Sequence, residues 1–415
     1  MLMVRHQLGT VGSLSVVERA LEFAYSASWL SHPRAFPLSP RMPLDVSSYR
    51  GEEVMYFFAN LLPEGPVLSA LCQLRSLPRG NVYRMLEAFG RECAGAFELI
   101  PIEHADDRAP EDYQAYSLKA IQADLADLRR NIPLLHRHGE LRLSLAGAQN
   151  KIPVRYSDGK LFLPMNGAPS THILKPTLQP ESEFPDAVRN EGLSLRLAGA
   201  LGIPVPNTLV LENPAPLLLI ERYDRVDDGD RIVRLHQLDL CQLVGALPDQ
   251  KYEADGGPGF KEAFAMIDAH SQSAAVDRLQ LVDVMLYNYL IGNADAHGKN
   301  ISMRYGLDGK LRIAPAYDLL STVYWPTLSD QMAMAIGGER RPAWTQARHW
   351  QRLCDSVGLN ITQLRKRANT HTERALLKLP RIADELGITH DSRLLKHWRK
   401  TLEQRGERMR QRIAV

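Results

Sequence analysis

The chain has 415 residues, of which 45% are hydrophobic and 24% charged, and this length suits about two or three compact domains. A net charge of +2 does not by itself indicate a nucleic-acid-binding protein, and four widely spaced cysteines predict neither a disulfide framework nor a zinc site. No segment reaches the roughly 20 apolar residues that cross a bilayer, and the N-terminus lacks a signal peptide, so we expect a soluble cytoplasmic protein.

The first predicted domain, residues 1–105, combines short alternating runs with helical patterns. Two segments, EEVMYFFANLLPEG and NVYRMLEAFGREC, are typical of helices, and AGAFELIPIE is typical of a strand. The polar, proline-containing stretch HADDRAPE then predicts a linker. A second domain over residues 106–225 and a third over residues 226–415 are expected to follow.

Within the second domain, small residues of the stretch LRLSLAGAQNK would let backbone N–H groups approach phosphates. Gly147 is its only glycine, so it is not a Walker motif. Ser144 stands at the start, where alternation gives an ordinary polar strand position. A plain strand turn is the alternative. The residues predicted to contact the nucleotide here are Ala146, Gly147, Ala148, Gln149 and Lys151.

A buried lysine and its partner are predicted next. KIPVRYSDGKLFLPM predicts a hairpin around Asp158 and Gly159, and THILKP predicts a short strand that carries Lys175. FPDAVRNEGLSLRLAGALGI predicts an amphipathic helix from which Glu191 reaches back toward the sheet. Because a buried strand rarely carries an unpaired lysine, we expect Lys175 to pair with Glu191.

Two further strands, TLVLE and PLLLIERYDR, follow this helix. The second leaves its apolar run at Glu221, Arg222 and Tyr223, where a hinge between two lobes would expose backbone groups to an adenine. A surface charge run at a strand end is the alternative interpretation.

The third domain is mostly helical. VDRLQLVDVMLYNYLIG predicts a helix with a C-cap at Gly292, followed by the polar loop NADAHGKN. ISMRY and LRIAP then predict two strands, and the motif AYDLLS follows them. The last stretch, from Asp391 onward, is rich in arginine and lysine and predicts a solvated basic helix face.

The order of these polar residues suits phosphoryl transfer from a metal nucleotide. Asp295 would accept the proton of the acceptor hydroxyl, while Asn300 and Asp318 would hold Mg²⁺ against the phosphates. His297 and Lys299 are candidates to orient the loop or to contact the transferring phosphate. For Asp295 and Asn300 alone, a capped helix followed by a polar turn explains the pattern almost as well as a catalytic site. The upstream Lys175 and Glu191 favour the kinase interpretation.

Together these segments resemble the HipA-type serine/threonine-protein kinases, the toxins of bacterial type II toxin–antitoxin modules. The motifs that carry the resemblance are LSLAGAQNK, HILKP, NE at 190–191, ERYDR, HQLDLCQ, YEADGGPG, LIGNADAHGKN and AYDLLS. VGSL, MYFFANLLPEG and AGAFELIP extend it to the first domain.

The resemblance implies an α+β, two-lobed protein-kinase-like fold with an N-terminal α/β subdomain and a mainly helical C-terminal lobe. It implies ATP and Mg²⁺ as cofactors, Asp295 as the base, Lys175 on the phosphates, and autophosphorylation at Ser144 that inactivates the enzyme. The implied partners are a small helix-turn-helix antitoxin, through which alone the chain would meet DNA, and an aminoacyl-tRNA synthetase as substrate. An inactive nucleotide-binding scaffold and a small-molecule phosphotransferase are the alternatives.

Overall fold

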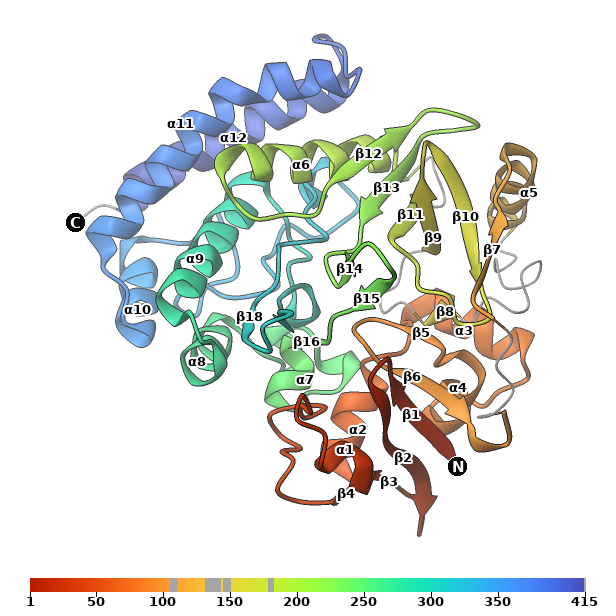
Figure 1. The fold of residues 1–415 in the computed structure, drawn as a ribbon. Helices are drawn as coiled ribbons and strands as arrows, with labels where there is room; N and C mark the ends of the chain where they lie inside the picture. The colour runs from red at the N-terminus through yellow and green to blue at the C-terminus, as the bar shows by residue number, and fades with distance from the viewer. Residues whose placement is uncertain (105–109, 131–142, 145–150, 178–182, 414–415) are drawn as a thin grey trace.

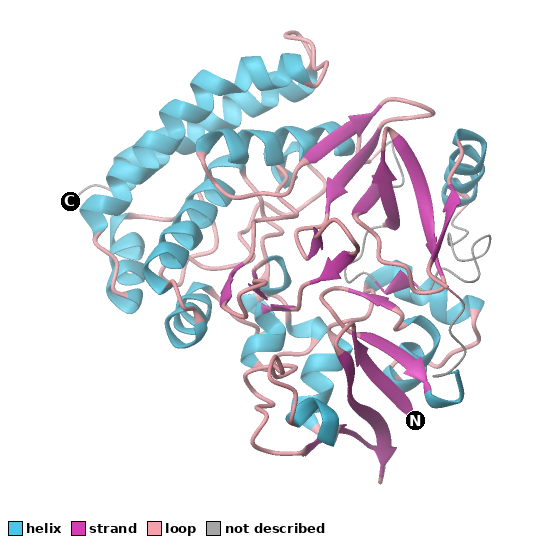
Figure 2. Cartoon of the chain, viewed as in Figure 1, coloured by secondary structure: helices cyan, strands magenta, loops and turns pink. Residues whose placement is uncertain are grey.

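The computed structural model describes residues 1–104, 110–130, 143–144, 151–177 and 183–413. Figure 1 shows the N-terminal sheet at the bottom, a second sheet at the upper right and most of the long helices at the left. Figure 2 shows the same division by element type, with strands and helices largely in separate regions. The expected α+β organisation is confirmed.

The first sheet is antiparallel and has the strand order β4-β3-β2-β1-β6. Leu2, Val4 and His6 alternate with less buried residues along β1, so one face of the sheet lies in the core. The strands are β1 (Leu2–His6), β2 (Gly9–Val17), β3 (Ala20–Tyr25), β4 (Ser48–Arg50) and β6 (Glu98–Pro101). The accompanying helices are α1 (Ala27–Leu30), α2 (Glu52–Ala59), α3 (Gly65–Leu74) and α4 (Val82–Phe89).

The second sheet is also antiparallel, with the order β12-β13-β11-β9-β10-β7. Asp158 and Gly159 have φ angles of 51° and 74°, which make the tight turn predicted between β9 and β10. The strands are β7 (Asp112–Ala115), β9 (Ile152–Ser157), β10 (Lys160–Met165), β11 (His172–Pro176), β12 (Thr208–Leu211) and β13 (Leu217–Glu221). Helices α5 (Leu118–Arg129) and α6 (Ala187–Leu201) belong to the same region. A short parallel pair, β5 (Glu92–Cys93) and β8 (Leu143–Ser144), joins the first region to the second.

The C-terminal region contains half of the α-helices that the structure describes. They are α7 (Leu240–Val244), α8 (Phe260–His270), α9 (Ala274–Ile291), α10 (Ala347–Val357), α11 (Ile361–Glu385) and α12 (Arg393–Arg412). Its strands are β14 (Arg225–Asp227), β15 (Ile232–Arg234), β16 (Gln237–Asp239), β17 (Ser302–Tyr305) and β18 (Leu311–Ile313). Among the residues that the structure describes, no helix is both long and apolar enough to cross a membrane.

Helix α9 ends where the sequence predicts. Gly292 adopts φ = 73° and caps the helix through its N–H, which donates to the Asn288 and Tyr289 carbonyls. A Cβ atom at this position would lie 2.4 Å from Cγ2 of Val323, so both the backbone conformation and the packing require glycine.

The basic helix α12 differs in one residue from the expected solvated face. Lys396, Arg399 and Arg410 are exposed, whereas Arg405 is buried and donates to the backbone carbonyl of Tyr289 on α9. The apolar face of α12 includes the buried Trp398. Arg405 therefore anchors the helix to the core and is not part of a basic surface.

The first and last regions share one apolar core. It runs from Phe57 and Phe97 of the first region to Leu238 and Met303 of the three-stranded sheet β16-β17-β18. The N-terminal region is thereby packed against the segment that carries the polar loop after α9.

Candidate active site

A cavity of about 780 Å³ lies between the second sheet and the C-terminal helices. Most of the predicted site residues that the structure describes line it. These are Lys151, Lys175, Glu191, Glu221, Arg222, Tyr223, Asp295, His297, Lys299, Asn300 and Asp318. Ala146, Gly147, Ala148 and Gln149, predicted to form the phosphate loop, lie outside the described residues.

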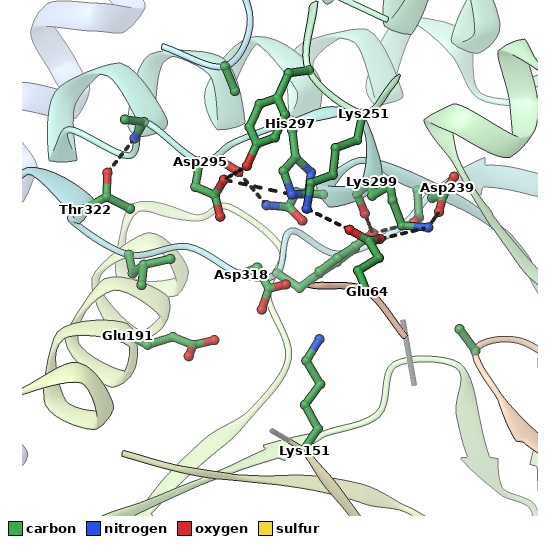
Figure 3. Close-up of a pocket in the computed structure, with 18 of the residues that line it drawn as sticks. Glu64, Lys151, Glu191, Asp239, Lys251, Asp295, His297, Lys299, Asp318 and Thr322 are labelled. Atoms are coloured by element: carbon green, nitrogen blue, oxygen red, sulfur yellow. Dashed lines mark hydrogen bonds and ion pairs between the residues drawn. The ribbon is translucent and has the colours of Figure 1, made fainter. Parts of the chain in front are cut away.

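Lys175 is the centre of a buried ion cluster. Its Nζ atom lies 2.6 Å from Oε1 of Glu191 on α6, as expected, and also pairs with Oδ1 of Asp318. Asp318 holds a left-handed backbone conformation with φ = 51°. Lys151 lies near this cluster, and Figure 3 shows its side chain and those of Glu191 and Asp318 pointing into one space. The predicted lysine and acid are therefore in contact, and the predicted metal ligand Asp318 joins them.

Burial and the neighbouring charges shift the pKa values of this cluster in opposite directions. Burial opposes the charged form of Lys175, but Asp318 and Glu191 raise the pKa of its ammonium group above the usual value. Burial likewise opposes the charge of Asp318, but Lys175 and Lys151 hold its pKa well below the usual range. Burial raises the pKa of the Glu191 carboxyl group. The positive charge of Lys175 lowers this pKa but offsets the effect of burial only in part. Two carboxylates facing two ammonium groups form a suitable place for nucleotide phosphates and their metal ion.

Asp295 and Asn300 lie side by side after α9, although five residues separate them. The amide nitrogen of Asn300 donates to the backbone carbonyl of Asp295 at 2.9 Å, which leaves the amide oxygen of Asn300 free of that bond. The Asp295 carboxylate is half exposed and accepts a hydrogen bond of 2.6 Å from the Tyr252 hydroxyl. Asp295 is therefore accessible to an acceptor hydroxyl, and the oxygens of Asn300 and Asp318 are ligands that suit Mg²⁺.

His297 is a buried, neutral residue. Burial lowers its pKa to about 4, and its ring packs edge-on against Tyr252 with the ring centroids 5.1 Å apart. Its Nε2 atom is 4.0 Å from Oδ1 of Asp295. Of the two roles predicted for His297, these contacts favour the one in which it orients the loop over the one in which it contacts the transferring phosphate.

Lys299 points away from the phosphate side of the cavity and into the protein. Its Nζ atom lies 3.0 Å from Oδ2 of Asp239 and donates to the backbone carbonyl and side-chain oxygen of Asn60 at 2.9 and 2.8 Å. These three contacts use the three hydrogens of the ammonium group. They favour the loop-orienting role over nucleotide contact.

The expected hinge residues Glu221, Arg222 and Tyr223 line the cavity. Several of their polar groups already bond within the protein and are therefore not available to a nucleotide. The Arg222 guanidinium is buried against Asp224, at 2.7 Å, and Ser170. The backbone N–H groups of Glu221 and Arg222 donate to neighbouring strands, and the Tyr223 ring stacks on Tyr317. The Arg222 side chain therefore binds within the protein, and the approach of the hinge backbone groups to an adenine stays a prediction.

The polar loop after α9, residues 293–300, carries the candidate base Asp295 and is called the catalytic loop below. Five polar residues near it were not predicted from the sequence. They are Asn60, Glu64, Asp239, Lys251 and Tyr252, and all line the cavity. The motifs MYFFANLLPEG and YEADGGPG contain three of them, Asn60, Glu64 and Tyr252, so polar residues within otherwise apolar or glycine-rich runs were the available signal.

Comparison with known proteins agrees with this geometry. A model of the HipA N-terminal domain matches residues 2–100, and a model of the HipA-like C-terminal domain matches residues 143–379. The putative kinase Y4mE of Sinorhizobium fredii is 36% identical, over 94% of this chain and 93% of that protein. The serine/threonine-protein kinase toxin HipA of Shewanella oneidensis is 30% identical, over 96% of this chain and 93% of that protein.

A solved structure of Shewanella oneidensis HipA in complex with HipB and operator DNA superposes with a TM-score of 0.84. It is 26% identical and covers 98% of this chain and 97% of that chain. Likeness in sequence and in fold thus extends over the N-terminal region and the cavity-bearing region alike. The chain belongs to the HipA family.

Proposed function

We propose that this protein is an ATP-dependent serine/threonine protein kinase that acts in the cytoplasm as the toxin of a toxin–antitoxin module. One observation carries the proposal. The accessible Asp295, its neighbour Asn300 and the Lys175–Glu191–Asp318 cluster all face a single cavity. These are the groups that a kinase needs to hold a metal nucleotide and to deprotonate an acceptor.

In the proposed reaction, Asp295 accepts the proton of a serine or threonine hydroxyl while the oxygen of that hydroxyl bonds to the γ-phosphorus of ATP. The bond between that phosphorus and the bridging oxygen of ADP breaks. Lys175, held by Glu191, would bind the α- and β-phosphates, while Asn300 and Asp318 would hold Mg²⁺. When bound, the metal neutralises the charge on the phosphate oxygens.

The proposed partners follow from family membership. The Shewanella oneidensis structure contains HipA, HipB and operator DNA. We propose that this chain likewise binds a small helix-turn-helix antitoxin and reaches DNA only through it. Its proposed substrate is a translation component, an aminoacyl-tRNA synthetase, whose phosphorylation would stop growth.

Incubation of the protein with [γ-³²P]ATP, Mg²⁺ and a cell lysate tests this function. A labelled protein band other than the kinase itself is expected. Label only in small metabolites would instead indicate a small-molecule phosphotransferase, and an absence of label would indicate a nucleotide-binding scaffold.

Ser144 is the proposed site of autophosphorylation. Its backbone lies in β8, paired with Cys93 of β5, directly before the expected phosphate loop. A phosphate there would add about two negative charges, which repel ATP phosphates and attract lysines such as Lys151 and Lys175. We expect mass spectrometry to find phosphate on Ser144 in active protein but not in an Asp295→Asn variant. Active protein with an unmodified Ser144, or a phosphorylated form that binds ATP tightly, would contradict this proposal.

A further inference from the structure

The end of α2 and the loop after it reach from the first region to the catalytic loop. Asn60 caps the C-terminus of α2 and is buried, and its amide nitrogen donates to the backbone carbonyl of Ala246 at 2.9 Å. Glu64 precedes α3, and its side chain is only 12% exposed. Figure 3 shows Glu64 directed toward Lys251 and Lys299.

Asn60 and Glu64 contact two lysines, Lys251 and Lys299, that line the cavity from the C-terminal region. These contacts form an interface between the N-terminal region and the catalytic loop. Glu64 lies 2.8 Å from Nζ of Lys251 and 3.5 Å from Nζ of Lys299. Asn60 offers Lys299 two oxygens, one from its side chain and one from the last turn of α2. A cation at a helix C-terminus is also favoured by the helix dipole.

The charges at this interface are balanced. Lys251 and Lys299 face the two carboxylates of Glu64 and Asp239. Burial opposes the charge of Glu64, but Lys299 and Lys251 hold its pKa below the usual value. Burial also opposes the charged form of Lys299, but Asp239 and Glu64 raise the pKa of its ammonium group above the usual value. Loss of Glu64 would leave two buried or partly buried cations with one carboxylate, so the lysines would move toward water.

Such a movement would reach the catalytic loop along two routes. Lys299 lies between Asp295 and Asn300 in the chain, directly beside the residue whose amide holds the Asp295 carbonyl. The carbonyl of Lys251 accepts a hydrogen bond of 3.0 Å from Gly298, and the neighbouring Tyr252 donates to Asp295. The two lysines thus control both the backbone of the loop and the orientation of the Asp295 carboxylate.

We propose that Asn60 and Glu64 are positioning residues of the phosphoryl-transfer reaction, through which the N-terminal region holds the catalytic loop in its working conformation. The inference rests on the proposed kinase function. Neither Asn60 nor Glu64 forms a hydrogen bond or an ion pair with the described residues of the Lys175–Glu191–Asp318 cluster, so we expect nucleotide binding to be independent of them.

Glu64→Gln tests the proposal, with Glu53→Gln as its matched control. Glu53 lies on α2, and its partner Arg41 also bridges to the C-terminal region through the Val244 carbonyl, but this pair is about one-third exposed and forms no ion pair with Lys251 or Lys299. Glu64→Gln is expected to lower kcat by about 10- to 100-fold, because a catalytic group misplaced by about 1 Å costs up to that much. The KM for ATP and the number of fluorescent nucleotide molecules bound per chain should stay unchanged. Glu53→Gln should keep all three values.

Hydrogen–deuterium exchange measures the same effect without any phosphoryl transfer. The amides of residues 293–301 are expected to exchange faster in Glu64→Gln than in the wild type or in Glu53→Gln. Asn60→Ala, which removes an oxygen from Lys299 without changing charge, should act in the same direction. It supplies the test if Glu64→Gln does not fold.

The possible failures are distinguishable. Unchanged kcat and unchanged exchange in both Glu64→Gln and Asn60→Ala would overturn the inference while the labelled protein band leaves the kinase function in place. A fall in kcat matched by an equal fall in bound nucleotide per chain would also overturn it, because that pattern reports partial unfolding. No labelled acceptor with any variant or the wild type would overturn the kinase function, and the inference with it.

Discussion

Replacing Asp295 by asparagine is expected to lower the rate of phosphoryl transfer to a protein acceptor by about 10²- to 10⁴-fold. An asparagine side chain cannot take up the proton that the acceptor hydroxyl must lose. It can still accept the hydrogen bond of the Tyr252 hydroxyl, which now lies 2.6 Å from Asp295, so the loop should keep its conformation. The affinity for nucleotide should change little, because the base acts on the acceptor and not on ATP.

Single-turnover transfer of ³²P from ATP, together with equilibrium binding of a fluorescent nucleotide, measures the two quantities separately. Asp308→Asn is the matched control, since Asp308 is exposed in the turn before β18 and its partners are local. In cells, Asp295→Asn should relieve growth arrest. Near-normal transfer by Asp295→Asn would show that another group is the base, and continued growth arrest would favour a scaffold.

Replacing Lys175 by methionine is expected to abolish ATP binding and to lower the free energy of unfolding by about 3–5 kcal/mol. Lys175 is 4% exposed and holds two carboxylates, those of Glu191 and Asp318. Its removal leaves the buried carboxylate of Glu191 facing that of Asp318, whose side chain is 28% exposed, and Lys151 is then a remaining nearby cation. The loss of one partner in a buried ion cluster costs more than the pair contributes, because the remaining charges stay buried.

This destabilisation should depend on pH with a definite sign. The pKa of Asp318 is depressed in the folded protein, so its contribution is present above the usual value of about 4 and is lost as the pH falls below it. The pKa of Lys175 is raised, so its contribution is present below about 10.4 and is lost at higher pH. The difference in the free energy of unfolding between wild type and Lys175→Met should therefore be largest near neutral pH and should narrow as the pH falls below about 4.

Thermal unfolding followed by circular dichroism at several pH values checks this prediction. Lys160→Met, which changes an exposed lysine at the start of β10, should match the wild type in stability and in nucleotide binding. A Lys175→Met variant that unfolds like the wild type at neutral pH would contradict the buried-cluster account. One that is destabilised but still binds ATP would contradict only the role on the phosphates.

Much of the local structure around the site could be predicted because its signals are local. Asp158 and Gly159 mark a two-residue turn, and Gly292 marks a helix end, since both positions need a left-handed backbone. Lys175 and Glu191 are 16 residues apart on a strand and the helix that follows it, so pattern and spacing were enough to pair them. A lysine in an apolar strand requires a partner, and Glu191 is the one acid within the helix that follows.

The surroundings of the catalytic loop were decided by tertiary structure alone. Asn60 and Lys299 are 239 residues apart, and nothing in their neighbouring residues indicates that they meet. Lys299 was a candidate for contact with the phosphate because a charged residue in a polar motif is expected to be exposed until its burial is known. Hydrophobic periodicity reports which face of an element is buried, whereas the partner of a buried charge depends on how distant elements pack. For this protein, the sequence by itself therefore determined most of the elements around the site and the candidates for the catalytic groups. Only the packing of the N-terminal region against the loop decided which charged side chains face the cavity and which contact the loop from inside the protein.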